Sequence, residues 1–155
     1  MDEAIIRYVR RKHQLLIGEA NAERIKIEVG SALLDATVAE AEVHIRGRDL
    51  RQGRPKSAIL GPHDVAEALQ DPMEELAEFI QRAIEELPPE VSTDIFERGV
   101  HMTGGGALLR HIDKELERRV GVKFIIPARP MHCVIEGTAE VLETLSEREY
   151  LLIKP

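Results

Sequence analysis

Hydrophobic and polar positions along residues 1–71 follow a pattern that predicts three helices and one β-hairpin. Ile5, Val9 and Leu16 fall roughly on one side of the first segment, as in a helix with one buried face. Val43 and Ile45 alternate with charged residues, as in a half-buried strand. The predicted elements are a helix over 2–16, a helix over 22–29, strands over 41–46 and 56–60, and a helix over 63–69.

Capping residues predict where the helices begin and end. Asn21 is a suitable N-cap for the second helix, and Gly30 is a suitable stop. Asp71, with Pro72 next and Glu74 three residues after the cap, predicts the start of a long helix. That helix carries an apolar stripe at helical spacing, which we expect to face the core. The stripe consists of Leu76, Phe79, Ile80, Ala83, Ile84 and Leu87.

The remaining residues alternate between helices and short strands, which predicts an α/β unit. Its two strands are expected to be joined by a right-handed strand-helix-strand crossover. Two short strands are too few for an ordinary sheet. The predicted elements are a short helix over 91–98, a strand over 100–102, a helix over 107–120, a strand over 122–126 and a helix over 133–145, before an apolar tail at 150–153.

Three consecutive glycines, Gly104 to Gly106, stand between a predicted strand and a predicted helix. Glycine has no Cβ, so a ligand can come close to the backbone there. The first turn of a following helix also has unpaired N–H groups and a partial positive charge. This pattern favours nucleotide binding. A tight strand-to-helix turn without any ligand is the alternative interpretation.

Composition narrows the class of protein. The chain has 155 residues, 43% of them hydrophobic, which supports a folded domain or two small lobes. Its net charge of −7 and its few aromatic residues argue against nucleic-acid binding. The single cysteine, Cys133, has no partner for an internal disulfide, and neither a signal peptide nor a long apolar run is found. These features favour a soluble, cytosolic protein.

No residues with a catalytic or metal-binding pattern stand out. The six histidines show no metal-ligand spacing. His132 and Cys133 are neighbours in sequence, but adjacency in sequence alone does not indicate a catalytic dyad. The paired glutamates at 74–75 and 85–86 fall on helix faces that we expect to be exposed. We therefore predict no catalytic residue and no metal ligand in this chain.

Several segments, in sequence order, resemble the MreB family of rod-shape-determining bacterial actin homologues. The resemblance extends from residue 2 to about residue 145. Its most specific segments are residues 2–11, 17–31, 46–50, 53–56 and 103–110. One departure lies near the end, where Ala139 replaces the second glycine of the family's Gly-Thr-Gly.

The resemblance implies an α/β, actin-like fold of the actin, Hsp70 and sugar-kinase ATPase type. The chain would cover only the second large domain, without the first strands of that domain. Residues 1–71 would form the small outer subdomain, and residues 72–155 would form the later part of the inner subdomain. Open strand edges would then make the isolated chain dependent on a partner, self-associating or less stable than its length suggests.

The resemblance also implies a nucleotide site with two walls. The wall on the base and sugar side would be Glu23, Arg24, Ile25 and Lys26, and the opposite wall would be Gly104, Gly105, Gly106 and Ala107. The family binds ATP with magnesium, but its two phosphate-binding hairpins would precede Asp2. We therefore do not expect this chain to hydrolyse ATP alone.

The family forms filaments that organise cell shape and cell-wall synthesis at the inner face of the bacterial membrane. The implied partners are further copies, full-length actin-like protomers and cell-wall morphogenesis proteins. The implied location is cytoplasmic, with no direct membrane contact from this half. The alternative hypothesis is a non-catalytic filament-interaction module, or a truncated relic, that binds no nucleotide.

Overall fold

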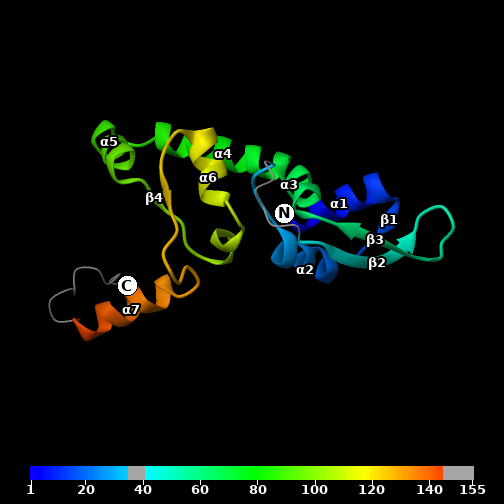
Figure 1. Cartoon of the computed structure of the whole chain (residues 1–155). Coiled ribbons are helices and arrows are strands. Elements are labelled where there is room, and N and C mark those ends of the chain that lie inside the picture. The colour runs from blue at the N-terminus through cyan, green and yellow to red at the C-terminus, as the bar shows by residue number, and fades with distance from the viewer. Residues whose placement is uncertain (35–40, 145–155) are drawn as a thin grey trace, which may run out of the picture.

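The computed structural model describes residues 1–34 and 41–144, and its elements follow one another along an elongated molecule (Figure 1). The helices are α1 (Asp2–His13), α2 (Glu19–Val29), α3 (Pro62–Ala68), α4 (Gln70–Glu85), α5 (Pro89–Arg98), the 3-10 helix η1 (Gly105–Leu108), α6 (Ile112–Val120) and α7 (Cys133–Glu143). The strands are β1 (Leu15–Leu16), β2 (Val43–Asp49), β3 (Pro55–Leu60), β4 (Val100–His101) and β5 (Phe124–Ile125).

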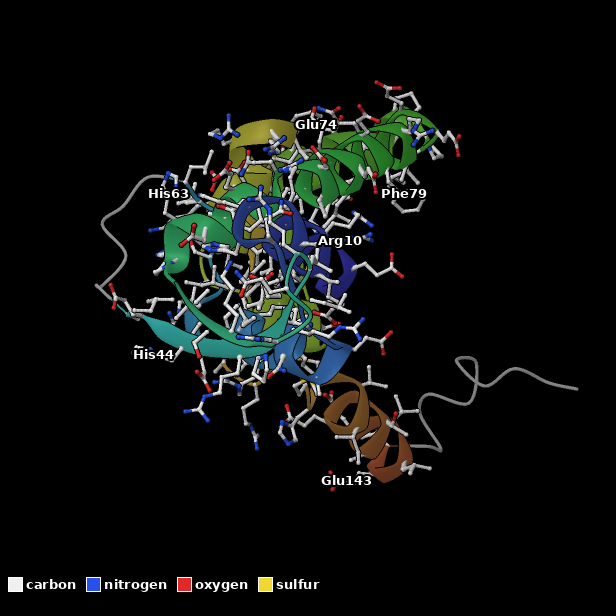
Figure 2. All side chains as sticks on the ribbon, turned by 90° about the vertical axis from the view of Figure 1, so that its right-hand side faces the viewer. Arg10, His44, His63, Glu74, Phe79 and Glu143 are labelled. Carbon is white, nitrogen blue, oxygen red and sulfur yellow. The ribbon has the colours of Figure 1, made fainter. Side chains whose placement is uncertain are left out.

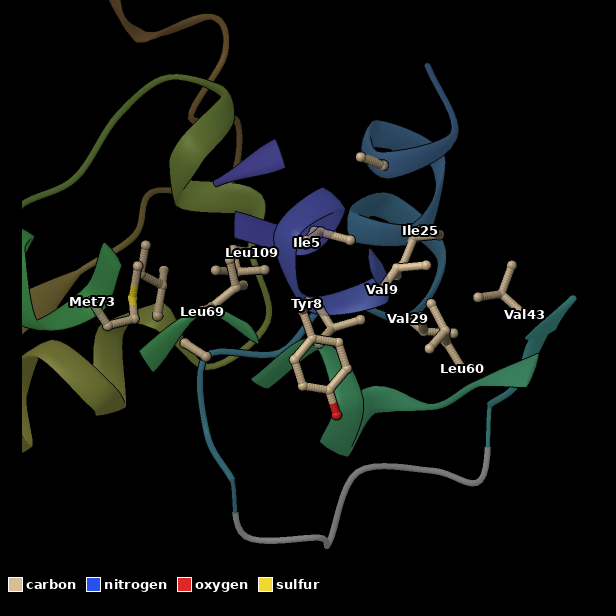
Figure 3. Packing of buried hydrophobic residues seen from close by; sticks show 14 of the residues in the cluster. Ile5, Tyr8, Val9, Ile25, Val29, Val43, Leu60, Leu69, Met73 and Leu109 are labelled. Atoms are coloured by element: carbon tan, nitrogen blue, oxygen red, sulfur yellow. The ribbon is translucent and has the colours of Figure 1, made fainter. Parts of the chain in front are cut away.

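The first part of the chain combines two packed helices with a three-stranded antiparallel sheet. The strand order is β1-β2-β3, and Val43 pairs with Leu60 across the predicted hairpin. The hydrophobic cluster lies between this sheet and helices α1, α2 and α3. In Figure 3, Ile5 and Val9 of α1 face Ile25 of α2.

The second part contains the predicted parallel pair of strands. Val100 of β4 pairs with Phe124 of β5, and α6 lies between the two strands in sequence. Helix α6 packs against α4, and its Ile112 and Leu116 are both fully buried. The hydrophobic cluster continues into this part through Met73 of α4. The predicted division after residue 71 therefore falls inside a packed region and remains a prediction.

A polar cluster ties the start of the chain to α3. The Tyr8 hydroxyl donates to Glu67 Oε2 at 2.7 Å and lies 2.9 Å from Asp64 Oδ1, and Lys12 bonds all three groups. Burial raises the pKa of Tyr8, while hydrogen bonds from Tyr8 and Lys12 lower the pKa of Glu67. The cluster fixes α1 in place and with it the segment that begins the chain.

Two of the predicted helix limits near the start are wrong. The first helix ends at His13, because Gln14 takes a left-handed conformation (φ 53°) and the next two residues form β1 beside β2. The second helix begins at Glu19 after an N-cap at Gly18, so Asn21 is not its cap.

The predicted helix start at Asp71 is also wrong. Helix α4 begins at Gln70, and the residue before it, Leu69, keeps a helical conformation after α3. Leu69 is fully buried, which favours this continuous path. Pro72 falls in the first turn of α4, where its missing N–H removes no helical hydrogen bond. A side chain of the first turn caps the preceding helix instead, where the Gly61 amide donates to Asp64 Oδ2 at 2.9 Å.

The apolar stripe of α4 faces the core only in part. Leu76, Ile80 and Ile84 are half-buried, and Phe79 is 64% exposed. Figure 2 shows Phe79 projecting outward from α4. The fully buried residues of this helix are Met73 and Ala77, near its start. The expectation of a fully core-facing helix is therefore wrong for its second half.

The helix predicted over 107–120 is two separate elements. The 3-10 helix η1 follows Gly104, and α6 begins only at Ile112, after His111 in a left-handed conformation (φ 61°). The glycines therefore do not lead directly into an α-helix. The last helix is confirmed as α7, with its Val134 exposed. Leu145 and the apolar tail at 150–153 lie outside the described residues.

Candidate functional site

A cavity of about 400 Å³ lies between α2 and the glycine segment. It combines apolar side chains, charged side chains and residues without a Cβ. This composition and size are typical of small-molecule sites in proteins. The lining residues are Met1, Glu23, Lys26, Ile27, Gly30, Gly105, Gly106, Leu108, Leu109, Arg110 and Met131.

Helical spacing explains the wall that α2 contributes. Glu23, Lys26, Ile27 and Gly30 stand at positions i, i+3, i+4 and i+7, so they share one face. The opposite face packs into the core. That core face carries Ala22, Ile25 and Val29. Four consecutive residues of a helix cannot all face one cavity, because successive residues are about 100° apart.

The second wall is the glycine segment. Gly104 has φ 82° and ψ −178°, a conformation that essentially only glycine adopts. Its amide donates to the Pro130 carbonyl at 2.8 Å. The backbone conformation therefore explains why position 104 is a glycine, without any role for a ligand.

Gly105 and Gly106 have no such explanation. Neither has a positive φ, and a Cβ would meet nothing within 4 Å at Gly106 and only Met131 Sδ, at 3.5 Å, at Gly105. Within residues 1–34 and 41–144, their amides donate to no backbone carbonyl or side chain. Two exposed glycines with available amides thus line the cavity.

Short contacts hold the two walls together. Ser31, just after α2, forms a parallel bridge with Arg110, and the Ala32 amide donates to the Arg110 carbonyl at 2.9 Å. The Arg110 side chain returns to α2 and donates from Nη2 to the Glu28 carbonyl at 3.0 Å. These bonds fix the width of the cavity at its base.

Charged and apolar groups occupy different parts of the cavity. Lys26 Nζ lies 2.8 Å from Asp2 Oδ1, and Glu23 is exposed beside it. Ile27, Leu108 and Met131 are also largely exposed, with their apolar surface turned to solvent or to the cavity. An apolar ring with polar edges would match these surfaces.

The structure brings together four of the eight site residues predicted from the sequence. Glu23, Lys26, Gly105 and Gly106 line the cavity, and the other four do not. Arg24 pairs with Glu28 at 3.1 Å and donates to the His44 carbonyl. Ile25 and Ala107 are buried in the protein, and Gly104 is the turn residue described above.

Sequence reasoning missed several lining residues. Ile27 and Gly30 could have been found, because they continue the helical face that starts at Glu23. Arg110 lies within a segment that the family resemblance covers, but no pattern marks it as a lining residue. Met131 reaches the cavity through a loop whose path no sequence pattern predicts.

In the part of the chain that the structure describes, no group of three or more His, Cys, Asp or Glu side chains could hold a metal ion. No helix among the same residues is long and apolar enough to cross a membrane.

Comparison with known sequences gives close relatives. The model of the MreB/Mbl protein family matches residues 1–150. The cell shape-determining protein MreB of Escherichia coli (strain K12) is 46% identical over 144 residues, which cover 93% of this chain and 41% of that protein. The cell shape-determining protein Mbl of Bacillus subtilis (strain 168) is 38% identical, over 94% of this chain and 43% of that protein. The chain thus spans less than half the length of these relatives.

Comparison with solved structures agrees with this result. MreB5 of Spiroplasma citri bound to AMPPNP matches with a TM-score of 0.87 and 31% identity, over 96% of this chain and 44% of that chain. A non-polymerising mutant of MamK bound to AMPPNP matches with a TM-score of 0.57 at 18% identity, which shows a shared fold. The predicted family and the predicted partial actin-like fold are confirmed: this chain belongs to the MreB/Mbl family.

Proposed function

We propose that this chain is the part of an MreB-type actin-like protein that forms the base and sugar side of an adenine-nucleotide site. One observation carries the proposal: Glu23 and Lys26 of α2 and Gly105 and Gly106 of η1 line the same cavity. These pairs lie about 80 residues apart in sequence. Their meeting at one cavity supports a common role.

The available glycine amides and the relatives support the same proposal. The backbone conformation at positions 105 and 106 does not require glycine. Close approach of a ligand is the remaining physical reason for glycine at these positions. Solved structures of MreB5 of Spiroplasma citri are described as bound to AMPPNP and to ADP, and they match 96% and 97% of this chain.

Each wall would contribute a different interaction. The Glu23 carboxylate can accept hydrogen bonds from ribose hydroxyls or from an exocyclic amine, and Lys26 can only donate. The amides of Gly105 and Gly106 would donate to oxygen atoms of the nucleotide. Ile27 and Met131 would pack against the base. The proposal includes no magnesium ligand and no residue for ATP hydrolysis in this chain.

Titration with ATP carrying a fluorophore on its terminal phosphate tests the proposal, because that label leaves the base and sugar free. We expect saturable binding that Gly105→Val weakens at least about tenfold, since the valine side chain would occupy space at the cavity wall. Gly137→Val on α7 is the matched control, because a Cβ there meets nothing and the site is elsewhere. A folded wild-type chain without saturable binding would contradict the proposal and favour the interaction module.

The names of the relatives support a wider role for the whole protein. Because this chain spans less than half of their length, we propose and do not assign a role in bacterial cell shape and cell-wall morphogenesis. This role would place the protein in the cytoplasm, at the inner face of the membrane. Cell-wall morphogenesis proteins would be its partners there.

Charge separation along the molecule supports self-association, as expected of a filament-forming family. Residues 46–56, around the β2–β3 hairpin, carry five Arg or Lys and one Asp. Residues 71–98, in α4 and α5, carry nine Asp or Glu and two Arg. Figure 1 shows the hairpin and α5 at opposite ends of the elongated molecule. We propose that the hairpin of one copy contacts α4 and α5 of the next.

Sedimentation at low and high ionic strength tests this contact. We expect an average mass above that of one chain at low salt, falling as salt screens the charges. The double variant Arg51→Glu with Arg54→Glu should remain monomeric at the same concentration. Arg7→Glu, an exposed change on α1, is the control. Association that persists unchanged in the double variant would exclude the hairpin contact.

A further inference from the structure

We propose that Asp2 is a positioning residue that holds the Lys26 ammonium group at the edge of the nucleotide cavity. This inference rests on the proposed function and adds to the site a residue from outside both walls. The carboxylate comes from the first turn of α1, and the lysine comes from α2. The distance between Asp2 Oδ1 and Lys26 Nζ is 2.8 Å.

The ion pair stands at the boundary between two cavities. Lys26 lines the cavity described above, and Asp2 lines a second cavity of about 530 Å³. Met1 and Glu23 line both, so the two cavities adjoin. The ion pair therefore joins a residue that lines the second cavity to a residue that lines the ligand cavity.

Packing and hydrogen bonds fix the position of helix α1, which carries this carboxylate. Ile5 and Val9 are 1% and 0% exposed, and the Tyr8 hydroxyl ties the helix to α3. Ile5, Val9 and the α2 residue Ile25 belong to the same buried cluster, and α1 packs against α2 (Figure 3). The relative position of Asp2 and Lys26 is thus set by packed residues on both helices.

Positioning is a better explanation of the pair than stability. The two side chains are 26% and 37% exposed, and ion pairs with this exposure contribute little to the free energy of unfolding. A free lysine side chain, by contrast, samples many rotamers, which a ligand would have to restrict on binding. A carboxylate that restricts Lys26 beforehand makes binding tighter without touching the ligand.

A double-mutant cycle with the terminally labelled ATP tests the proposal. We expect Asp2→Asn to weaken binding by about three- to tenfold and Asp2→Glu to restore part of the loss. In a Lys26→Ala background, Asp2→Asn should have no further effect, because Asp2 acts through Lys26. Glu3→Gln on the same turn of α1 is the control and should leave binding unchanged. An equal loss from Asp2→Asn with and without Lys26 would overturn the proposal.

A second measurement does not depend on nucleotide binding. Mass spectrometry can follow the rate at which an acylating reagent modifies Lys26. This rate should rise at least about twofold in Asp2→Asn, because the lysine loses its ion-pair partner, and should stay constant in Glu3→Gln. An unchanged rate would show that Asp2 does not hold the lysine. If the wild-type chain binds no ATP while this rate rises in Asp2→Asn, the proposed function is wrong, but the conclusion that Asp2 restricts Lys26 is supported.

Discussion

Replacing Gly30 by alanine is expected to lower the free energy of unfolding by about 3 kcal/mol, a large part of the stability of a small domain. Gly30 follows α2 at the base of the cavity. A Cβ there would lie 2.1 Å from the Lys26 carbonyl oxygen and 2.9 Å from Leu109 Cδ1. The first of these atoms belongs to the backbone of α2, so the helix end itself would have to move. Chemical denaturation monitored by circular dichroism measures the loss.

Gly106→Ala is the matched control for this prediction. It lines the same cavity, but its Cβ would meet nothing within 4 Å. We expect a change within about 0.5 kcal/mol, as for ordinary exposed substitutions. Equal losses in the two variants would mean that the contact between α2 and the Leu109 segment does not have this geometry.

Glu115→Ala is expected to destabilise the chain by about 3 kcal/mol, because it removes a buried carboxylate and leaves the largely buried Arg119 without that partner. The Glu115 side chain is 3% exposed and sits on α6. Its Oε1 accepts from Arg118 Nη2 at 2.7 Å and from Arg119 Nε at 2.6 Å. Arg119 also donates to Gln70 Oε1 at 2.9 Å and pairs with Glu74, so the cluster joins α6 to α4.

Thermal and denaturant unfolding of this variant measure the effect. Glu117→Ala on the same helix is the control, because Glu117 is exposed and its side chain is outside the cluster. We expect that control to stay within about 0.5 kcal/mol of the wild type. A comparable loss in both variants would indicate that helix propensity, and not the ionic cluster, determines the stability of α6.

Local signals predicted the elements well where local interactions decide the structure. The alternation of Val43 and Ile45 predicted β2, and Gly121 marked the end of α6, where its φ is 79°. The two strands β4 and β5 pair in parallel, as the order of elements predicted. In these cases the residue pattern and the tertiary fold favour the same conformation.

Tertiary contacts decided the predictions that were wrong. Leu16 continues the apolar side of a helix in sequence, but it pairs with Arg48 as part of β1. A signal for that strand exists in Gly47, where a Cβ would lie 2.3 Å from the Leu16 carbonyl oxygen. A glycine inside a strand can mark such a close approach, yet the sequence alone does not name the segment that approaches.

The residues of the candidate site were predicted from the family resemblance and not from residue patterns. The two segments that it named, in α2 and at the glycine turn, both contribute residues to the cavity. Within α2, however, the helical period separates Glu23 and Lys26 from Ile25, which is buried. The resemblance named a run of consecutive residues, whereas only residues on one face of α2 line the cavity. Contributions from Met1 and Met131 depend on the fold of distant segments, which residue patterns do not specify.

Amide NMR of the isotope-labelled chain during titration with ADP tests whether a nucleotide binds between α2 and the glycine turn. We expect saturable chemical-shift changes at Lys26, Ile27, Gly105 and Gly106, with one common dissociation constant. Shifts that do not saturate at these four amides, or that are confined to the β2–β3 hairpin, would contradict a nucleotide site between α2 and the glycine turn.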